Sequence, residues 1–182
     1  MTNEGDDGRF VETYSGVRFF PFDPHPSTIQ IVDIAQGLSH TCRYSGQCQF
    51  YYSVAQHSLY VANELEREGY DSRLQCYGLF HDAAEAYLSD LPRPIKAEFE
   101  EFSALEERIL AAVWEAFDLD SPTPDEWEVV MDADDRLLHY EAGELLADGS
   151  WADPVDLPYE LVPLSPAAVR EQFLDRAETL LD

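Results

Sequence analysis

Apolar side chains recur every three or four positions along most of the chain, which is the period of an amphipathic α-helix. The first such stretch starts near Ile31, and its apolar side chains share one face. That face comprises Ile31, Ile34, Ala35 and Leu38. The same pattern predicts helices over Val54 to Glu68 and from Ser72 to about Leu88. We expect Pro92 and Pro94 to close the third helix, because proline breaks a helix interior.

Two tetrapeptides match the capping box, in which a serine or threonine caps a helix and a glutamate three residues later bonds back to it. They are Ser103-Ala-Leu-Glu106 and Thr123-Pro-Asp-Glu126. We therefore expect helices that start at these boxes and run to about Phe117 and about Leu146.

The two ends of the chain carry simpler signals. Phe10 to Phe20 reads as a short β-hairpin around Ser15-Gly16. Ser165-Pro166 opens a last helix, which should end near Leu180 and serve packing rather than chemistry. The prediction is an all-α fold in a single domain over 1–182. It has a hairpin at about 10–20, a helical core at about 31–146 and a C-terminal helix at about 166–180.

The charge is strongly one-sided. The 182 residues include 37 acidic and 11 basic side chains, a formal net charge of −26. Such a chain repels a nucleic-acid backbone, so a nucleic-acid polymer is excluded as partner. Lys96 is the only lysine, and a surface of carboxylates with almost no lysine indicates a halophilic protein, since dense salt screens self-repulsion. An acidic decoy surface is the competing interpretation.

The chain shows no sign of a membrane or secreted protein. It contains no stretch of about 20 apolar residues, and the first eight residues are polar and acidic, unlike an ordinary export signal. Cys42, Cys48 and Cys76 lack the spacing of a disulfide framework or a thiolate zinc site. We expect a cytoplasmic protein with reduced thiols.

Candidate chemistry begins with His81-Asp82, which lies among small and apolar residues of the predicted third helix. A carboxylate buried there costs several kcal/mol unless it is paired or binds a metal, so a positive group should lie beside Asp82. On a 3.6-residue period, Glu85 shares a side of the helix with both residues. The alternative is a helix with solvated acids.

Two further residues offer metal ligands from other helices. His57 has apolar neighbours in its helix, although a lone histidine in that setting is more often a hydrogen-bonded core residue. Asp134 borders the apolar stripe of its helix more closely than Asp132 or Asp135 does, and otherwise reads as one acid on a solvated face.

The order His57, His81-Asp82, Asp134 resembles the H…HD…D signature of the HD-domain metal-dependent phosphohydrolases. The segments Ala55-Gln-His-Ser-Leu59, Leu79-Phe-His-Asp-Ala-Ala-Glu85 and Asp90-Leu-Pro-Arg-Pro-Ile-Lys96 are similar to those of its 5′-deoxynucleotidase branch and of viral nucleotide-hydrolase relatives. The resemblance runs from about residue 31 to about residue 146 and implies an HD-domain helical bundle.

The resemblance implies that His57, His81, Asp82 and Asp134 bind one divalent metal ion, with Glu85 as the catalytic acid or base. The ligand types do not distinguish Co, Mn, Fe, Zn and Ni, and Mg stays open.

It also implies a substrate pocket. Arg43, fourteen residues before His57, matches an arginine that holds the substrate phosphate. The next position is often tryptophan in that branch and is Tyr44 here, which predicts a weaker preference for deoxyribose. Asp90 matches a catalytic-pocket aspartate, and Lys96 a lysine that helps to bind phosphate.

The expected function is that of a metal-dependent phosphohydrolase acting on a small-molecule nucleotide, most simply a 5′-deoxynucleoside monophosphate. Two alternatives stay open: a triphosphohydrolase of nucleoside triphosphates with the same metal site, and a non-enzymatic acidic metal-binding or interaction module. No membrane partner is expected, and a homo-oligomer stays open.

Overall fold

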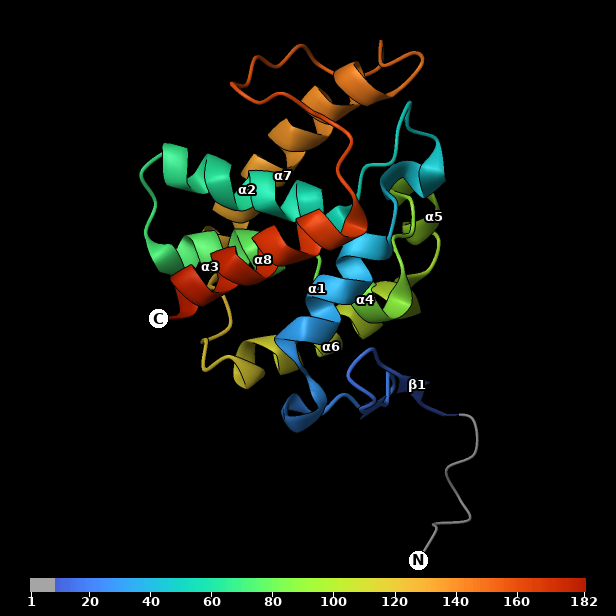
Figure 1. Ribbon diagram of the computed structural model, residues 1–182, viewed down its shortest axis with the longest axis vertical. Helices are drawn as coiled ribbons and strands as arrows, with labels where there is room; N and C mark the ends of the chain where they lie inside the picture. Colours follow the sequence, from blue (N-terminus) through green and yellow to red (C-terminus); the bar gives the residue numbers. More distant parts are fainter. Residues whose placement is uncertain (1–8) are drawn as a thin grey trace, which may run out of the picture.

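The computed structural model describes residues 9–182. The prediction that the first eight residues are not an export signal concerns a segment outside the described residues. The fold is mainly helical with one small hairpin, as predicted (Figure 1). The elements in order are β1 (Val11–Glu12), β2 (Arg18–Phe19), the 3-10 helix η1 (Pro26–Thr28), α1 (Ile31–His40), the 3-10 helix η2 (Arg43–Gly46), α2 (Val54–Arg67), α3 (Ser72–Phe80), α4 (Glu85–Leu88), α5 (Arg93–Lys96), α6 (Glu100–Ala116), α7 (Pro124–Leu145) and α8 (Pro166–Leu181).

The predicted hairpin is confirmed and is tied to the helices. β1 and β2 are antiparallel, with Val11 opposite Phe19, and Gly16 in the turn has a φ of 82°. The Ser15 backbone N–H donates to Oδ1 of Asp33 in α1 at 2.7 Å, and its hydroxyl donates to Oδ2 at 2.8 Å. These bonds fix the hairpin against the start of α1.

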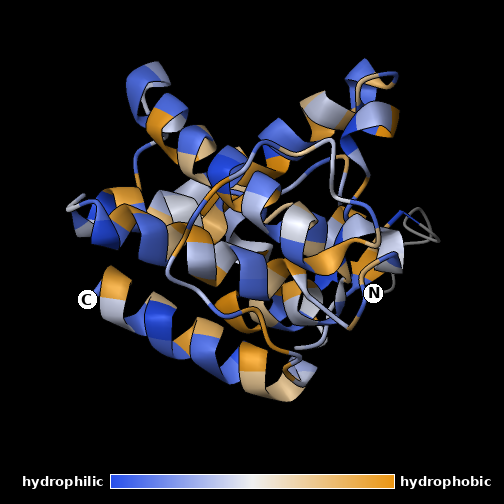
Figure 2. Ribbon diagram, turned by 90° about the horizontal axis from the view of Figure 1, so that it is seen from above, coloured by the Kyte–Doolittle hydropathy of each residue, from blue (hydrophilic) through white to orange (hydrophobic). Residues whose placement is uncertain are grey.

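The core forms where α2 packs against α3, α7 and α8, while α1 packs against α8 and α4. Polar and apolar residues alternate along the helices with the helical period, so each helix buries one side (Figure 2). The last helix is a packing element, as expected, because Val169, Phe173 and Ala177 of α8 are fully buried.

The predicted third helix is wrong in its second half. α3 ends at Phe80, the residues 81–84 form turns, and α4 then covers only Glu85–Leu88. In these turns the Ala83 N–H donates to the Phe80 carbonyl and the Glu85 N–H to the Asp82 carbonyl, each at 2.9 Å and each spanning three residues rather than four. His81-Asp82 therefore follows a helix end rather than lying in mid-helix.

A contact with α1 accompanies this break. A Cβ added to Gly37 in α1 would lie 2.7 Å from the carbonyl oxygen of Ala86 in α4, so the two backbones touch. α4 already ends at Leu88, and Ser89 after it has a φ of 74°. The prolines therefore do not close a long helix, and Pro94 instead lies in the first turn of α5.

The two predicted capping boxes have different outcomes. Thr123 caps α7 and forms the complete box with Glu126. The box at Ser103 does not form, because α6 begins three residues earlier at Glu100. The Glu106 carboxylate accepts a hydrogen bond from Lys96 Nζ at 2.7 Å instead of bonding to the Ser103 backbone. Farther along, the Ser165 hydroxyl accepts from the Ala168 N–H at 3.2 Å and caps α8 as predicted.

Within residues 9–182, no helix combines the length and the apolar composition needed to cross a bilayer. Cys42, Cys48 and Cys76 are free, as expected.

Candidate metal centre

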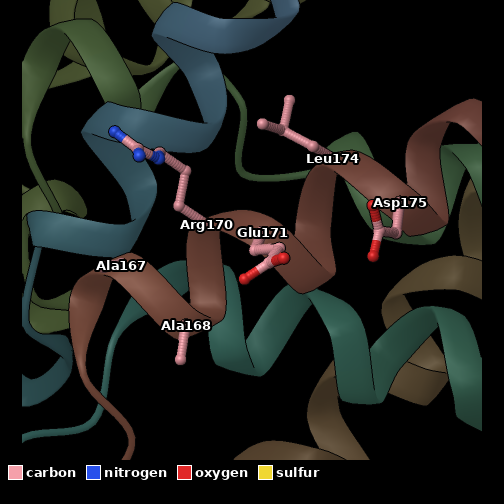
Figure 3. Close-up of a pocket in the computed structure, with 6 residues that line it drawn as sticks. All are labelled: Ala167, Ala168, Arg170, Glu171, Leu174 and Asp175. Carbon is pink, nitrogen blue, oxygen red and sulfur yellow. The ribbon is translucent and has the colours of Figure 1, made fainter.

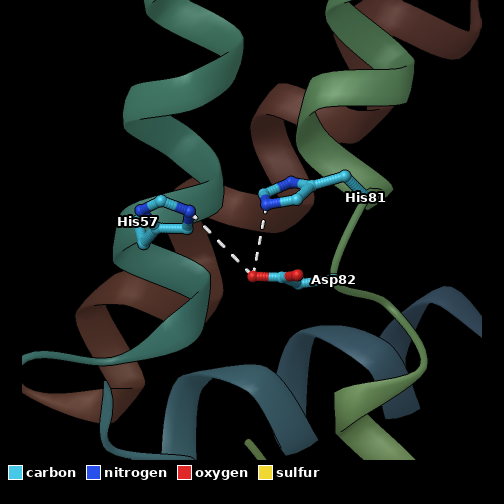
Figure 4. Close-up of side chains that lie close together, drawn as sticks. All are labelled: His57, His81 and Asp82. Carbon is cyan, nitrogen blue, oxygen red and sulfur yellow. Dashed lines mark ion pairs between the residues drawn. The ribbon is translucent and has the colours of Figure 1, made fainter. Parts of the chain in front are cut away.

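Three of the predicted ligands meet where α2 faces the end of α3. His57 projects from the first turn of α2, and His81 and Asp82 follow α3 directly (Figure 4). One ligand atom from each residue lies within 4.8 Å of the others. Both imidazoles are buried, while the Asp82 side chain is 20% exposed, so the group opens to solvent on the carboxylate side.

Asp134 of α7 lies beside this group and contacts both histidines. Its Oδ1 lies 2.9 Å from His57 Nε2 and 3.8 Å from His81 Nε2. Asp82 Oδ2 lies 3.2 Å from His81 Nε2 and 4.0 Å from His57 Nε2. Ligand atoms at about 2.1 Å from one ion lie about 3.0 Å apart at right angles and about 4.2 Å apart on opposite sides. The four distances fall in or next to that range, so His57, His81 and Asp82 could hold one divalent ion, and Asp134 lies at ligand distance from both histidines.

The hydrogen bonds of the two imidazoles determine which nitrogen faces the group. His57 Nδ1 is 2.7 Å from Glu141 Oε1, and His81 Nδ1 is 2.8 Å from the Gly78 carbonyl oxygen. Both partners only accept, so each ring, in the neutral form that binds a metal, carries its proton on Nδ1. Each Nε2 then presents a lone pair. Among the described residues, neither buried Nε2 has a hydrogen-bond partner, which is the state of a metal ligand.

The charges around the group hold its carboxylates ionised. Without an ion, burial opposes the charged form of His81, but Asp82 and Asp134 outweigh it and raise the pKa of that imidazole well above its usual value. Burial alone would raise the pKa of Asp82, and the attraction of this protonated ring holds that pKa well below the usual range. Burial also opposes ionisation of Asp134, yet its contacts with His57 and His81 keep that pKa low. The positive neighbour expected beside Asp82 is present, since Arg43 Nη1 lies 3.5 Å from Asp82 Oδ2.

Glu85 lies at the start of α4, buried beside the group. Burial and the negative charge of Asp82 raise its pKa well above the usual value. Its Oε2 is buried without a hydrogen-bond partner among the described residues, and its Oε1 lies 3.6 Å from Lys96 Nζ. Asp90 is half-buried, and burial raises its pKa as well.

The backbone that carries Arg43 and Tyr44 is strained. Tyr44 and Ser45 have φ values of 54° and 51°, in the left-handed region that non-glycine residues seldom adopt. The loop is anchored by the Arg43 N–H, which donates to the Tyr52 carbonyl at 2.9 Å. The Tyr44 hydroxyl lies 3.3 Å from the Leu138 carbonyl, to which it donates, so this ring is held against α7. Strain of this kind concentrates at functional sites.

The sequence reasoning missed two residues of this region. Arg93 of α5 pairs with Asp134 Oδ2 at 2.7 Å and with Asp135 Oδ1 at 2.6 Å, which places a half-exposed cation on the solvent side of the group. Glu141 is completely buried behind His57. Its position seven residues after Asp134, two helical turns along one face, was a usable signal. No sequence signal indicated the pairing of Arg93, because this pairing depends on how α5 lies against α7.

A surface depression of about 440 Å³ lies elsewhere, along α8 (Figure 3). Its lining includes Arg170, Glu171 and Leu174 and shares no residue with the candidate metal-binding group.

Two bacterial proteins are similar to nearly the whole chain. Uncharacterized protein YfdR of Escherichia coli (strain K12) is 33% identical over 179 residues, which cover 94% of this chain and 95% of YfdR. Uncharacterized protein RCAP_rcc00048 of Rhodobacter capsulatus is 35% identical over 184 residues, which cover 92% of this chain and 93% of the relative. No protein-family model matches the chain. At this identity and coverage, the chain belongs to the family that includes YfdR and RCAP_rcc00048.

Proposed function

We propose that this protein is a divalent-metal-dependent phosphohydrolase that releases phosphate from 5′-deoxynucleoside monophosphates in the cytoplasm. One observation carries the proposal. Two buried histidines direct unpartnered Nε2 atoms toward two ionised carboxylates, all at distances that suit one ion. The resemblance of these residues to the HD-domain signature supports the same interpretation and suggests the nucleotide substrate.

His57, His81, Asp82 and Asp134 would hold the ion. Two neutral imidazoles and two carboxylates supply a charge of −2, which balances a divalent cation. Imidazole and carboxylate suit Mn, Fe, Co, Ni and Zn, and Mg is a weaker match because it prefers oxygen ligands. A divalent ion at this place supplies positive charge for phosphoryl oxygens and lowers the pKa of water.

The other side chains would bind and orient the substrate. Arg43 offers a planar set of N–H donors beside Asp82, which suits two phosphate oxygens. Lys96 adds a cation next to Glu85. Glu85, with one buried carboxylate oxygen free of hydrogen bonds, would orient water or move a proton to the leaving oxygen. Asp90 would line the same pocket, and Tyr44 would lie near the sugar.

The test is phosphate release from a panel of deoxy- and ribonucleoside mono- and triphosphates, run with several divalent metals at molar salt. We expect release from monophosphates, faster with deoxyribose. Turnover of triphosphates alone, with tripolyphosphate as product, would favour the triphosphohydrolase. Metal binding without turnover of any substrate would favour the non-enzymatic module. The same metal-loaded protein, measured by light scattering, would show whether it is an oligomer.

A further inference from the structure

Glu141 is a completely buried carboxylate that contacts both parts of the proposed site. It lies on α7, and its side chain has no exposed surface. Oε1 accepts hydrogen bonds from the Tyr52 hydroxyl and from His57 Nδ1, both at 2.7 Å. Oε2 lies 3.1 Å from Arg43 Nε and 3.4 Å from the Tyr44 hydroxyl. One carboxylate thus joins a candidate metal ligand to the candidate phosphate-binding loop.

We propose that Glu141 is a positioning residue that orients His57 for metal binding and Arg43 for phosphate binding, and so couples the two. This inference rests on the proposed function. It concerns a residue that touches neither the ion nor the substrate and acts through the two side chains that do.

The contacts explain how each partner is held. An ionised carboxylate only accepts, so it keeps the His57 proton on Nδ1, directs the Nε2 lone pair to the ion and makes the imidazole a stronger ligand. Its charge also offsets that of Arg43, which is itself buried. Because Glu141 holds the Nε edge of the guanidinium, Nη1 stays on the side of Asp82.

The chain offers a matched control in Glu64 of α2. Glu64 is also completely buried, and it is also held by an arginine and a tyrosine. Its Oε1 pairs with Arg67 Nη2 at 2.6 Å, and its Oε2 accepts from the Tyr159 hydroxyl at 2.9 Å. It contacts none of the candidate ligands. Glu64→Gln therefore removes a charge that is also inaccessible to solvent, without touching the site.

The first measurement uses metal-free protein, titrated to the alkaline limit at which the His57 ring is neutral, and reads the ¹⁵N shifts of that ring, identified by their loss in His57→Asn. Wild type should show the Nδ1–H tautomer. Glu141→Gln should keep it, because the amide carbonyl still accepts, whereas Glu141→Met should move His57 toward the Nε2–H form. An unchanged His57 signal in folded Glu141→Met would overturn the role of Glu141 in orienting the ring.

The second measurement is affinity for Mn²⁺ by equilibrium dialysis, followed by affinity of the loaded protein for inorganic phosphate. Glu141→Gln should bind Mn²⁺ about 10- to 100-fold more weakly, the usual effect of losing a group that supports a metal ligand. It should also bind phosphate more weakly, since Arg43 loses its anchor. Glu64→Gln should lower the thermal midpoint but stay within twofold of wild type in both affinities.

The outcomes separate the two proposals. Mn²⁺ and phosphate affinities of Glu141→Gln within twofold of wild type would overturn the coupling. Equal losses in Glu64→Gln would also overturn it, because the effect would then be one of general stability. Wild-type protein that binds no divalent metal would refute the proposed function, while the tautomer of the metal-free protein would still decide whether Glu141 orients His57.

Discussion

His57 and His81 differ in what holds their rings. A buried carboxylate, Glu141, accepts the Nδ1 proton of His57, whereas the neutral carbonyl of Gly78 accepts that of His81. A carboxylate acceptor makes an imidazole a stronger ligand than a carbonyl does. His57 should therefore be the tighter of the two histidine ligands.

Asp82→Asn should abolish both metal binding and turnover. A neutral amide cannot replace an ionised ligand, and Arg43 would lose one of its two carboxylate partners. Metal content by mass spectrometry on folded protein checks this, with Asp132→Asn, an exposed acid nearby on α7, as control. Stoichiometric metal in folded Asp82→Asn would show that Asp82 is not a ligand.

Glu85→Ala should behave differently. The metal should be retained, because the four ligands stay in place, and hydrolysis should fall by ~10² or more, as for a lost general acid or base. The measurements are metal content and kcat on the best monophosphate of the panel. If the variant loses its metal as well, Glu85 is a ligand and its assigned role is wrong.

The short helix α4 depends on a backbone contact with α1. Gly37 allows the approach, since any Cβ there would overlap the carbonyl oxygen, Cα and Cβ of Ala86, at 2.7 to 2.8 Å. These atoms belong to the backbone and the first side-chain carbon, so they cannot rotate away. Because α4 begins with Glu85, the contact also determines where that carboxylate lies relative to Asp82.

Gly37→Ala should destabilise the protein even though alanine is the better helix former. Overpacking costs about 1–3 kcal/mol, which outweighs a propensity gain of about 1 kcal/mol. Displacement of α4 should also lower kcat. Urea unfolding measures the first effect, and Gly143→Ala is the control.

Gly143 lies in α7 with no atom within 4 Å of an added Cβ, so its substitution should stabilise by up to about 1 kcal/mol. Equal stability changes in the two variants would show that the contact between α1 and α4 is not tight.

Across the molecule, 37 acidic side chains are opposed by only 11 lysines and arginines, and three of these cations lie around the candidate metal-binding group. These are Arg43, Arg93 and Lys96. An anionic substrate is repelled at long range by the whole protein, so its binding depends on this local cluster, on the ion and on screening by salt.

Dilution below about 0.5 M salt should expand or unfold the protein, because the screening length grows from ~3 Å at 1 M to ~10 Å at 0.1 M. Carboxylate repulsion then acts over several neighbouring side chains. The thermal midpoint in KCl from 0.1 to 2 M checks this, with sucrose as an uncharged control. A midpoint that stays constant across the salt series would remove the argument for a halophilic protein.

Features that depend on short stretches of chain were predictable from the sequence. The helical period, the box at Thr123 and Glu126, the cap at Ser165 and the turn at Gly16 each arise from residues within a few positions of one another. The grouping of His57, His81 and Asp82 was also expected, from the resemblance of their order and types to a known signature.

Other features depend on contacts between distant segments, and only the folded chain decides them. The predicted third helix breaks after Phe80, where Gly37 of α1 contacts α4. Helix α6 starts before its predicted cap, and Glu106 pairs with Lys96. Arg93 reaches Asp134, and Glu141 joins His57 to Arg43, through packing of helices that lie far apart in sequence. Local propensities differ by about 1 kcal/mol or less per residue, so a single close contact or buried ion pair is enough to override them.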